Sequence, residues 1–366
     1  MNEMREDMKR ILIDAYCVTN FGDDLFVKLL CDRYPKTKFY INCSRFDDTA
    51  FESIPNLTIM NRKHFKGMII HNFKKLMNKI HLDINFPYDG QVYIGGSIFP
   101  EPDLFKASDW NNFIDYHQKK SSHIPFYLLG INFGPYHSEI FKQCVEDYLK
   151  QTTDVCFRDQ YSYQLFSYLP QVRYAPDIIF QCPVLKQDKK NNIVISVIYN
   201  DERYDLKSYD NDLYIKKLAL LVDYYHDLGK QVTLVTFCKA QKDHLSAELI
   251  NQQVKKGADI LQYQGNLQEI IDVFSDCEYV IGTRFHSIVM AMNATVPVYP
   301  IIYNDKTSHL LDDLSFQGQS SQIQDFYKQS IEMIDANRIN HYVLDIAEVK
   351  QKSAKHFQNL DQFIGE

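Results

Sequence analysis

The chain has 366 residues, of which 45% are hydrophobic and 24% charged, with only 13 Gly and 12 Pro. This composition excludes a disordered or fibrous protein, and at roughly 150 residues per domain the length favours two folded domains. A formal net charge of -7 argues against a general attraction to nucleic acid, so any anion site must be local. The N-terminus lacks a signal-peptide pattern and no long apolar run follows, which predicts a cytoplasmic protein.

Short β-branched and aromatic runs alternate with amphipathic stretches along the chain, beginning with Ile11 to Cys17. The pattern pauses at a polar, basic stretch after Phe180 and restarts at Asn192. Such alternation is typical of parallel α/β sheets, and two facing sheets leave a ligand crevice at the carboxyl ends of their strands. We therefore predict two Rossmann-like α/β domains across a cleft: residues 1–182, a linker over 183–191, residues 192–330, and a C-terminal helical segment over 331–366.

The stretch from Cys277 to Lys306 contains the most informative local pattern. A buried strand runs into Gly282, and a Met- and Ala-rich helix is predicted from Ser287 to Ala294. Arg284 and His286 therefore lie at a helix N-terminus, where backbone N–H groups favour an anion. Arg binds carboxylates or phosphates in bidentate fashion, and His can carry a proton near neutral pH. The structural alternative is a capped core helix with an incidental Arg and a hydrogen-bonded His.

Several segments occur in an order that resembles the polysaccharide pyruvyltransferase family. The most specific is Gly282-Thr283-Arg284-Phe285-His286, with Tyr303 and Lys306 following it. The others are Asn20-Phe21-Gly22-Asp23, Tyr93 to Phe99, Leu128 to Pro135, Arg158-Asp159-x-x-Ser162, Pro176-Asp177 and Phe237 to Asp243. Each is short, and the resemblance rests on their collinear order over roughly residues 10–310. Ser97 is a departure, because the family's turn commonly has a third Gly there.

The resemblance implies a GT-B-like fold and transfer of pyruvate from phosphoenolpyruvate to two hydroxyls of a saccharide, forming a ketal during cell-surface or exopolysaccharide biosynthesis. A donor with a carboxylate and a phosphate needs several cations, and Arg158, Arg284 and Lys306 are the candidates. We predict His286 as the general acid that protonates the methylene carbon, because an imidazolium held among anions has a raised pKa. Arg284 and Arg158 would clamp the two anionic ends. This chemistry requires no metal and no cofactor.

The predicted catalytic residues are thus His286 and Arg284, and the predicted substrate-binding residues are Arg158, Lys306, Tyr303, Ser287, Gly282, Asn20, Gly22, Asp23, Gly95 and Gly96. Structural alternatives remain open for several of them. Asp23 could be only the N-cap of the first helix, Gly95 and Gly96 could only pack a turn, and Arg158 could form a structural ion pair with Asp159. A turn role is favoured for Asp177, which we leave out of the catalytic set.

Residues 61–82 contain six basic side chains and no acidic one, in a chain that is acidic elsewhere. Apolar residues recur there at helical spacing, which predicts a basic amphipathic helix. Such a helix could contact an anionic membrane surface through residues 62–81, at the inner face where a lipid-linked saccharide acceptor would lie. Alternatively, it could bury its apolar side against its own domain.

Two other functions compete with pyruvyl transfer. A GT-B glycosyltransferase or epimerase could place the diphosphate of a nucleotide sugar on Arg284 and the helix N-terminus, and fold alone does not separate these reactions. Against it, the sequence has neither a GxGxxG nor a Walker motif. A non-catalytic relative that binds a glycan is the second alternative. The presence of Arg158, Arg284, His286 and Lys306 together argues against a loss of catalysis.

Overall fold

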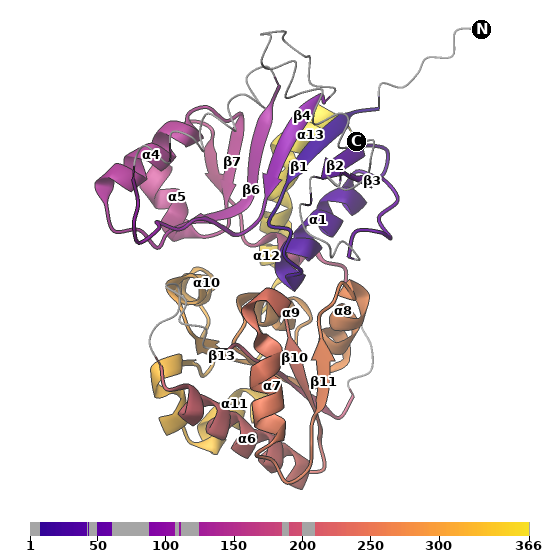
Figure 1. Ribbon diagram of the computed structural model, residues 1–366, viewed down its shortest axis with the longest axis vertical. Coiled ribbons are helices and arrows are strands. Elements are labelled where there is room, and N and C mark those ends of the chain that lie inside the picture. The colour runs from indigo at the N-terminus through magenta and orange to yellow at the C-terminus, as the bar shows by residue number, and fades with distance from the viewer. Residues whose placement is uncertain are drawn as a thin grey trace, which may run out of the picture.

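A computed structural model of the protein describes residues 8–41, 43, 50–60, 88–106, 110, 124–184, 190–199 and 209–365. Within these residues the chain forms two β-sheets, and all strand pairs in both are parallel. Helices flank both sheets, which lie one above the other in Figure 1. The architecture confirms the predicted pair of Rossmann-like α/β domains.

The first sheet has the strand order β3-β2-β1-β4-β6-β7-β8, with β5 beside β6. Its central strand β6 is buried along its whole length, as expected for a parallel sheet covered on both faces. The strands are β1 (Arg10–Asp14), β2 (Lys38–Ile41), β3 (Leu57–Ile59), β4 (Gly90–Ile94), β5 (Ser97–Phe99), β6 (Phe126–Phe133), β7 (Asp154–Phe157) and β8 (Val172–Tyr174). The helices are α1 (Phe21–Arg33), α4 (Glu139–Leu149), α5 (Gln160–Phe166) and the 3-10 helix η1 (Ile178–Gln181).

The second sheet has the order β11-β10-β9-β12-β13-β14. Its strands are β9 (Asn192–Ser196), β10 (Gln231–Thr236), β11 (Asp259–Gln262), β12 (Tyr279–Gly282), β13 (Val298–Ile302) and β14 (Ser321–Gln322). Its helices are α6 (Asn211–Asp227), η2 (Lys239–Gln241), α7 (Asp243–Asn251), α8 (Leu267–Asp276), α9 (Phe285–Asn293), α10 (Asp305–Asp313), η3 (Ile323–Lys328) and α11 (Ile331–Ile339). The Met-rich helix α9 begins two residues earlier than the sequence pattern predicts.

The two domains meet at the loops that follow their strands. The backbone N–H of Phe21 donates to the carbonyl of Phe237 at 3.1 Å, and Asn20 forms an antiparallel bridge with Cys238. The Tyr263 hydroxyl lies 2.7 Å from a carboxylate oxygen of Asp24, both side chains being buried. These contacts bring the start of α1 against the second domain, so the carboxyl ends of the two sheets face each other.

The C-terminal helices return to the first domain. In Figure 1 the yellow helices α12 (Ala347–Ser353) and α13 (Gln358–Ile364), joined by η4 (Ala354–Phe357), lie against the first sheet. The Asp361 carboxylate accepts hydrogen bonds from Nε and Nη2 of Arg33 at 2.8 and 2.7 Å, and from the Tyr34 hydroxyl at 2.7 Å. In contrast, α11 packs on β13 of the second sheet. The segment after residue 330 is therefore shared between the two domains.

The predicted basic helix over residues 62–81 lies outside the described residues, as do residues 185–189 of the predicted linker. Among the helices that are described, none is both long and apolar enough to cross a membrane.

Replacing Asp361 with Ala tests how much the returning helices stabilise the first domain. Because three donors lose their partner, we expect the free energy of unfolding to fall by about 1–3 kcal/mol, measured by urea denaturation. The control is Glu348→Ala, which removes an exposed pair with Lys352 on α12 and should cost less than about 0.5 kcal/mol. Equal effects of the two substitutions would contradict a stabilising role for the Asp361 contacts.

Candidate active site

A cavity of about 850 Å³ lies between the two domains, at the carboxyl ends of the strands. It is lined from both sides, by the turns after β1, β4, β6 and β7 and by those after β10, β12 and β13. Eight of the twelve predicted site residues line it: Asn20, Asp23, Gly96, Arg158, Arg284, His286, Tyr303 and Lys306. The cavity therefore brings together side chains from distant parts of the sequence.

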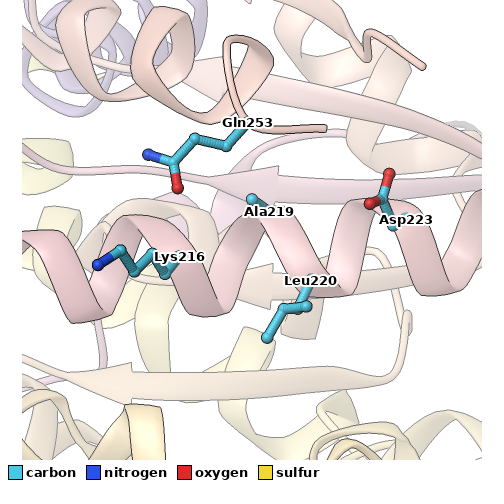
Figure 2. A pocket seen from close by; sticks show the side chains of 5 residues that line it. All are labelled: Lys216, Ala219, Leu220, Asp223 and Gln253. Carbon is cyan, nitrogen blue, oxygen red and sulfur yellow. The ribbon is translucent and has the colours of Figure 1, made fainter. Parts of the chain in front are cut away.

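A second hollow, of about 290 Å³, lies on the outside of α6 (Figure 2). Lys216, Ala219, Leu220 and Asp223 follow one another along this helix, and Gln253 lies across from them. Leu220 is 56% exposed, so this hollow is a shallow groove on an open surface. The interdomain cavity, where polar groups converge, is the candidate active site.

His286 extends from the start of α9 toward the first domain. Its Nε2 atom lies 3.2 Å from Nη1 of Arg158 and 4.0 Å from a carboxylate oxygen of Asp177. Because a guanidinium can only donate, Nε2 must accept, which places the proton of a neutral imidazole on Nδ1. The ring also packs edge-on against Phe26, with 5.4 Å between ring centroids.

The protonation state of His286 differs from the sequence-based expectation. Burial lowers its pKa well below the usual value, and the nearby cations Arg158, Lys306 and Arg284 lower it further. We expected an imidazolium among anions, with a raised pKa, and that prediction is wrong for the ligand-free protein. A bound anion would have to offset these cations before His286 could hold a second proton.

Arg158 is held between both domains. Its Nη1 donates to Asp177 at 3.0 Å and its Nη2 to Oδ1 of Asn132 at 2.8 Å. The guanidinium also lies over the Phe285 ring of the second domain, 4.3 Å from the centroid. The proposed structural pair with Asp159 does not form, because Asp159 accepts from the backbone N–H of Ser162 and caps α5.

Asp177 has two tasks at this position. As expected from the Pro-Asp pair, it caps a turn, since its Oδ1 accepts from the backbone N–H of Ile179 at 2.8 Å. Its other oxygen holds Arg158. Asp177 therefore positions the cation rather than acting on the cavity itself.

Two glycines of the predicted substrate site make room for these side chains. A Cβ on Gly22 would lie 1.6 Å from Nδ1 of His286, and a Cβ on Gly96 would lie 2.6 Å from Nη2 of Arg158. Neither side chain could keep its position if the glycine carried a methyl group. Gly22 and Gly95 do not line the cavity, so substrate contact by these two glycines is not supported by the structure.

Arg284 is already engaged by its own domain. Nε donates to Oδ2 of Asp243 at 2.9 Å, Nη2 donates to Oδ1 of the same carboxylate, and Nη1 donates to Oε1 of Gln241. Asp243 is fixed in turn by the backbone N–H groups of Phe237 and Cys238. The bidentate fork predicted to clamp the substrate thus binds Asp243, and Arg284 contributes a fixed positive charge at the cavity wall.

The backbone N–H groups at the start of α9 are less available to an anion than the sequence indicated. The backbone N–H groups of Thr283 and Arg284 donate to the Ser196 hydroxyl at 3.0 and 3.2 Å. Ser287 lies 2.6 Å from the same hydroxyl and is fully buried. Ser287 in α9 and Gly282 at the end of β12 do not line the cavity, so the structure does not support substrate contact by these two residues.

Asp23 lies in the first turn of α1, but Asn20 is the N-cap, because its side chain accepts from the backbone N–H of Gly22. The Asp23 carboxyl is buried at the cavity wall. Burial raises its pKa to about 6, although Arg158 and Lys306 oppose the shift. Asp23 can therefore hold or release a proton near neutral pH, a property that the sequence analysis did not assign to it.

Lys306 adds a further cation to the cavity wall. Its ammonium lies 5.9 Å from the centroid of the Phe285 ring and 5.6 Å from that of Tyr303. No carboxylate among the described residues forms an ion pair with it. The charge of Lys306 therefore remains available to an anion in the cavity.

Sequence analysis also missed Asn132, which lines the cavity at the end of β6. Asn132 belongs to the segment Leu128 to Pro135, to which the sequence analysis assigns no site residue. A polar side chain in the otherwise apolar run Phe126–Phe133 was the signal that could have found it. Within the described ranges, no three His, Cys, Asp or Glu side chains gather as metal ligands would.

Comparison with known proteins agrees with this architecture. The chain aligns with UDP-GlcNAc 2-epimerase from Neisseria meningitidis bound to UDP-GlcNAc, with a TM-score of 0.57 at 7% identity, covering 97% of this chain and 99% of that one. Anabaena HepE in complex with UDP and glucose gives a TM-score of 0.56 at 12% identity, covering 98% and 99% of the two chains. At these identities the likeness shows the fold alone, and the protein is of the two-domain GT-B class.

Its family follows from the sequence. A family model described as polysaccharide pyruvyl transferase matches residues 20–305. The chain is also 21% identical, over 296 residues, to the amylovoran biosynthesis protein AmsJ of Erwinia amylovora, covering 73% of this chain and 68% of that protein. Because the family model spans most of its length, the chain belongs to the polysaccharide pyruvyl transferase family.

Substituting Gly22 with Ala tests the close contact with His286. We expect a loss of about 1–3 kcal/mol in the free energy of unfolding, because the new methyl group overlaps the imidazole. The loss should shrink by at least about 1 kcal/mol in a His286→Ala background, as measured by a double-mutant cycle in urea.

The matched control is Gly257→Ala, whose Cβ would meet its nearest atom only at 3.9 Å. It should change the free energy of unfolding by no more than about 0.5 kcal/mol. Additive effects of Gly22→Ala and His286→Ala would show that the two residues do not touch.

Proposed function

We propose that the protein transfers pyruvate from phosphoenolpyruvate to two hydroxyls of a saccharide, giving a pyruvate ketal during the synthesis of a cell-surface or exported polysaccharide. The observation behind this proposal is the convergence of Arg158, His286, Lys306 and Asp23 on one cavity. Two cations can bind the anionic groups of this donor, and two groups that exchange protons can serve the proton transfers of the reaction. Membership of the pyruvyl transferase family supports the same reaction.

The charge of the cavity suits an anionic donor. Phosphoenolpyruvate carries a carboxylate and a phosphate, so it brings nearly three negative charges into the site. Among the described residues, no carboxylate forms an ion pair with Lys306. Arg158 donates to one carboxylate oxygen, that of Asp177. The negative groups of the donor would therefore find two cations, Arg158 and Lys306, in the cavity wall.

The reaction moves protons as well as charge. The methylene carbon of the donor gains a proton, C2 forms a bond to one sugar oxygen, and a second sugar oxygen then displaces phosphate. Of the two protons that the hydroxyls lose, one balances the new methyl group and the other leaves with phosphate. His286 donates to the methylene carbon once the bound anion has raised its pKa, and Asp23 accepts from the attacking hydroxyl.

A nucleotide sugar is the competing donor, because the solved neighbours include complexes with UDP. Thermal unfolding in the presence of phosphoenolpyruvate or of UDP- and GDP-sugars separates the two. Stabilisation by phosphoenolpyruvate supports pyruvyl transfer, whereas stabilisation by a nucleotide sugar alone would favour a glycosyltransferase or epimerase. Phosphate release that depends on an added saccharide would exclude a non-catalytic binding protein.

Binding of phosphoenolpyruvate should take up a proton near pH 7, because the anion raises the pKa of a neutral His286. Titration calorimetry in buffers of different ionisation enthalpy measures this uptake directly. His286→Gln should reduce the uptake and abolish turnover while leaving the fold intact. His309→Gln is the control, because His309 also lines the cavity but does not contact Arg158, and this variant should retain the uptake. A fully active His286→Gln enzyme would remove this residue from the mechanism.

Asp23→Asn should stabilise the free protein at high pH. Because the folded-state pKa is raised from 3.8 to about 6, the ionised carboxyl is disfavoured in the fold. Its favourable contribution is present at pH values below about 4 and is lost as pH rises through 6. The variant should therefore gain up to about 3 kcal/mol over the natural protein at pH 8 and nothing at pH 4, in urea unfolding.

The same substitution should lower acceptor-dependent turnover by about 100-fold or more. Asp313→Asn provides the control, because the pKa of Asp313 is also raised to about 6 but this residue does not line the cavity. It should shift stability with pH in the same direction and retain most of the activity. Equal losses of activity in the two variants would argue against proton transfer by Asp23.

A further inference from the structure

We infer that Asn132 is a substrate-binding residue, whose side-chain amide donates a hydrogen bond to the same anionic group that Arg158 binds. The inference rests on the proposed function, because the anion is a carboxylate or phosphate group of the donor. It adds a residue to which neither the family motifs nor the sequence analysis gave a role.

The orientation of the Asn132 amide follows from its two partners. Oδ1 lies 2.8 Å from Nη2 of Arg158 and 3.2 Å from the hydroxyl of Ser97. Since a guanidinium offers donors only, the atom facing Arg158 must be the amide oxygen. The nitrogen, Nδ2, is thereby turned to the other side.

Nδ2 is left without an acceptor from the protein. Asn132 is only 5% exposed and lines the interdomain cavity. Among the described residues, no oxygen accepts a hydrogen bond from Nδ2, and the atom is not sealed away from the cavity. A buried amide that keeps two free N–H donors is costly unless a ligand or water satisfies them.

The position of these donors is fixed by the strands. The backbone N–H of Asn132 donates to the carbonyl of Gly96 at 3.0 Å, and Ser97 is its partner in the register of β5 and β6. The backbone N–H of Arg158 donates to the carbonyl of Ile131, the residue before Asn132. Amide and guanidinium therefore lie side by side on neighbouring backbone, preorganised to bind one planar or tetrahedral anion.

Ser97 gives this chain a particular arrangement. Its hydroxyl donates to Oδ1 of Asn132 at 3.2 Å. The hydroxyl reinforces the orientation that Arg158 already imposes. Ser97 is thus a positioning residue, and its loss should matter less than the loss of the amide.

The test compares phosphoenolpyruvate affinity by calorimetry in three variants. Asn132→Asp keeps an oxygen for Arg158 but replaces the donor with a negative charge, so it should bind at least about 10-fold more weakly than the natural protein. The affinity of Asn132→Ala for phosphoenolpyruvate should lie between that of Asn132→Asp and that of the natural protein. Ser97→Ala should stay within about threefold, because Arg158 still fixes the amide.

The order of the two Asn132 variants separates direct binding from positioning. If Asn132 served only to hold Arg158, Asn132→Asp would keep that contact and would bind phosphoenolpyruvate more tightly than Asn132→Ala. This order of affinities would overturn the inference. If thermal unfolding shows that Asn132→Asp does not fold, NMR of the natural protein provides the test instead. The Asn132 side-chain amide is the ¹⁵N resonance that disappears in Asn132→Ala. It should shift on titration of the natural protein with phosphoenolpyruvate, and a resonance that does not move overturns the inference.

Two smaller probes identify the group that is bound. Inorganic phosphate should lose affinity in Asn132→Asp if the amide binds the phosphate, and pyruvate should do so if it binds the carboxylate. Loss with either probe supports the inference. A natural protein that binds no phosphoenolpyruvate would overturn the proposed function together with this inference, whereas normal binding with unchanged affinity in the variants would overturn only the role of Asn132.

Discussion

The contact between Arg158 and His286 is the interaction on which the rest of the site depends. It joins the two domains inside a cavity, with a permanent cation 3.2 Å from a ring nitrogen. Such closeness is tolerable only while the imidazole is neutral, since two buried positive charges would repel strongly. Asp177 compensates one charge, and Lys306 remains without an acid among the described residues. Arg158, Lys306 and Arg284 thus disfavour the charged form of His286, an effect that an anionic ligand beside the ring would offset.

Bringing these two side chains together constrains backbone far away in the sequence. Gly22 and Gly96 stand where a Cβ would collide with the imidazole and the guanidinium. Both glycines look like ordinary turn residues when only their neighbours in the chain are considered. Glycine is required there for a steric and tertiary reason, because the colliding groups come from the turn after β7 and from α9. Backbone conformation at Gly22, in the first turn of α1, and at Gly96, after β4, is therefore not the reason that glycine is needed there.

The sequence predicted the fold better than it predicted the chemistry of the site. Periodicity and motif order located both parallel sheets and the α9 helix, because these depend on local pattern and on strand ends. The sequence could not show that Arg284 pairs with Asp243, or that the Ser287 hydroxyl contacts Ser196, because those contacts join separate segments. The direction of the His286 pKa shift also depends on packing, first through burial of the ring and then through the cations Arg158, Lys306 and Arg284 around it. Local sequence determines which groups exist at a site, whereas packing determines their charge.

The opposite pKa shifts of Asp23 and His286 have a common cause and a shared consequence. Burial disfavours the charged form of each, so the pKa of the carboxyl rises to about 6 and that of the imidazole falls. Near neutral pH both groups are then mainly in their basic forms, and neither can donate a proton efficiently. In the proposed reaction, a trianionic donor beside His286 changes this balance, since its negative charge raises the pKa of the imidazole. On the proposed mechanism, the ability to protonate the donor would therefore arise only when the donor is bound, which would favour donor binding before the acceptor reacts.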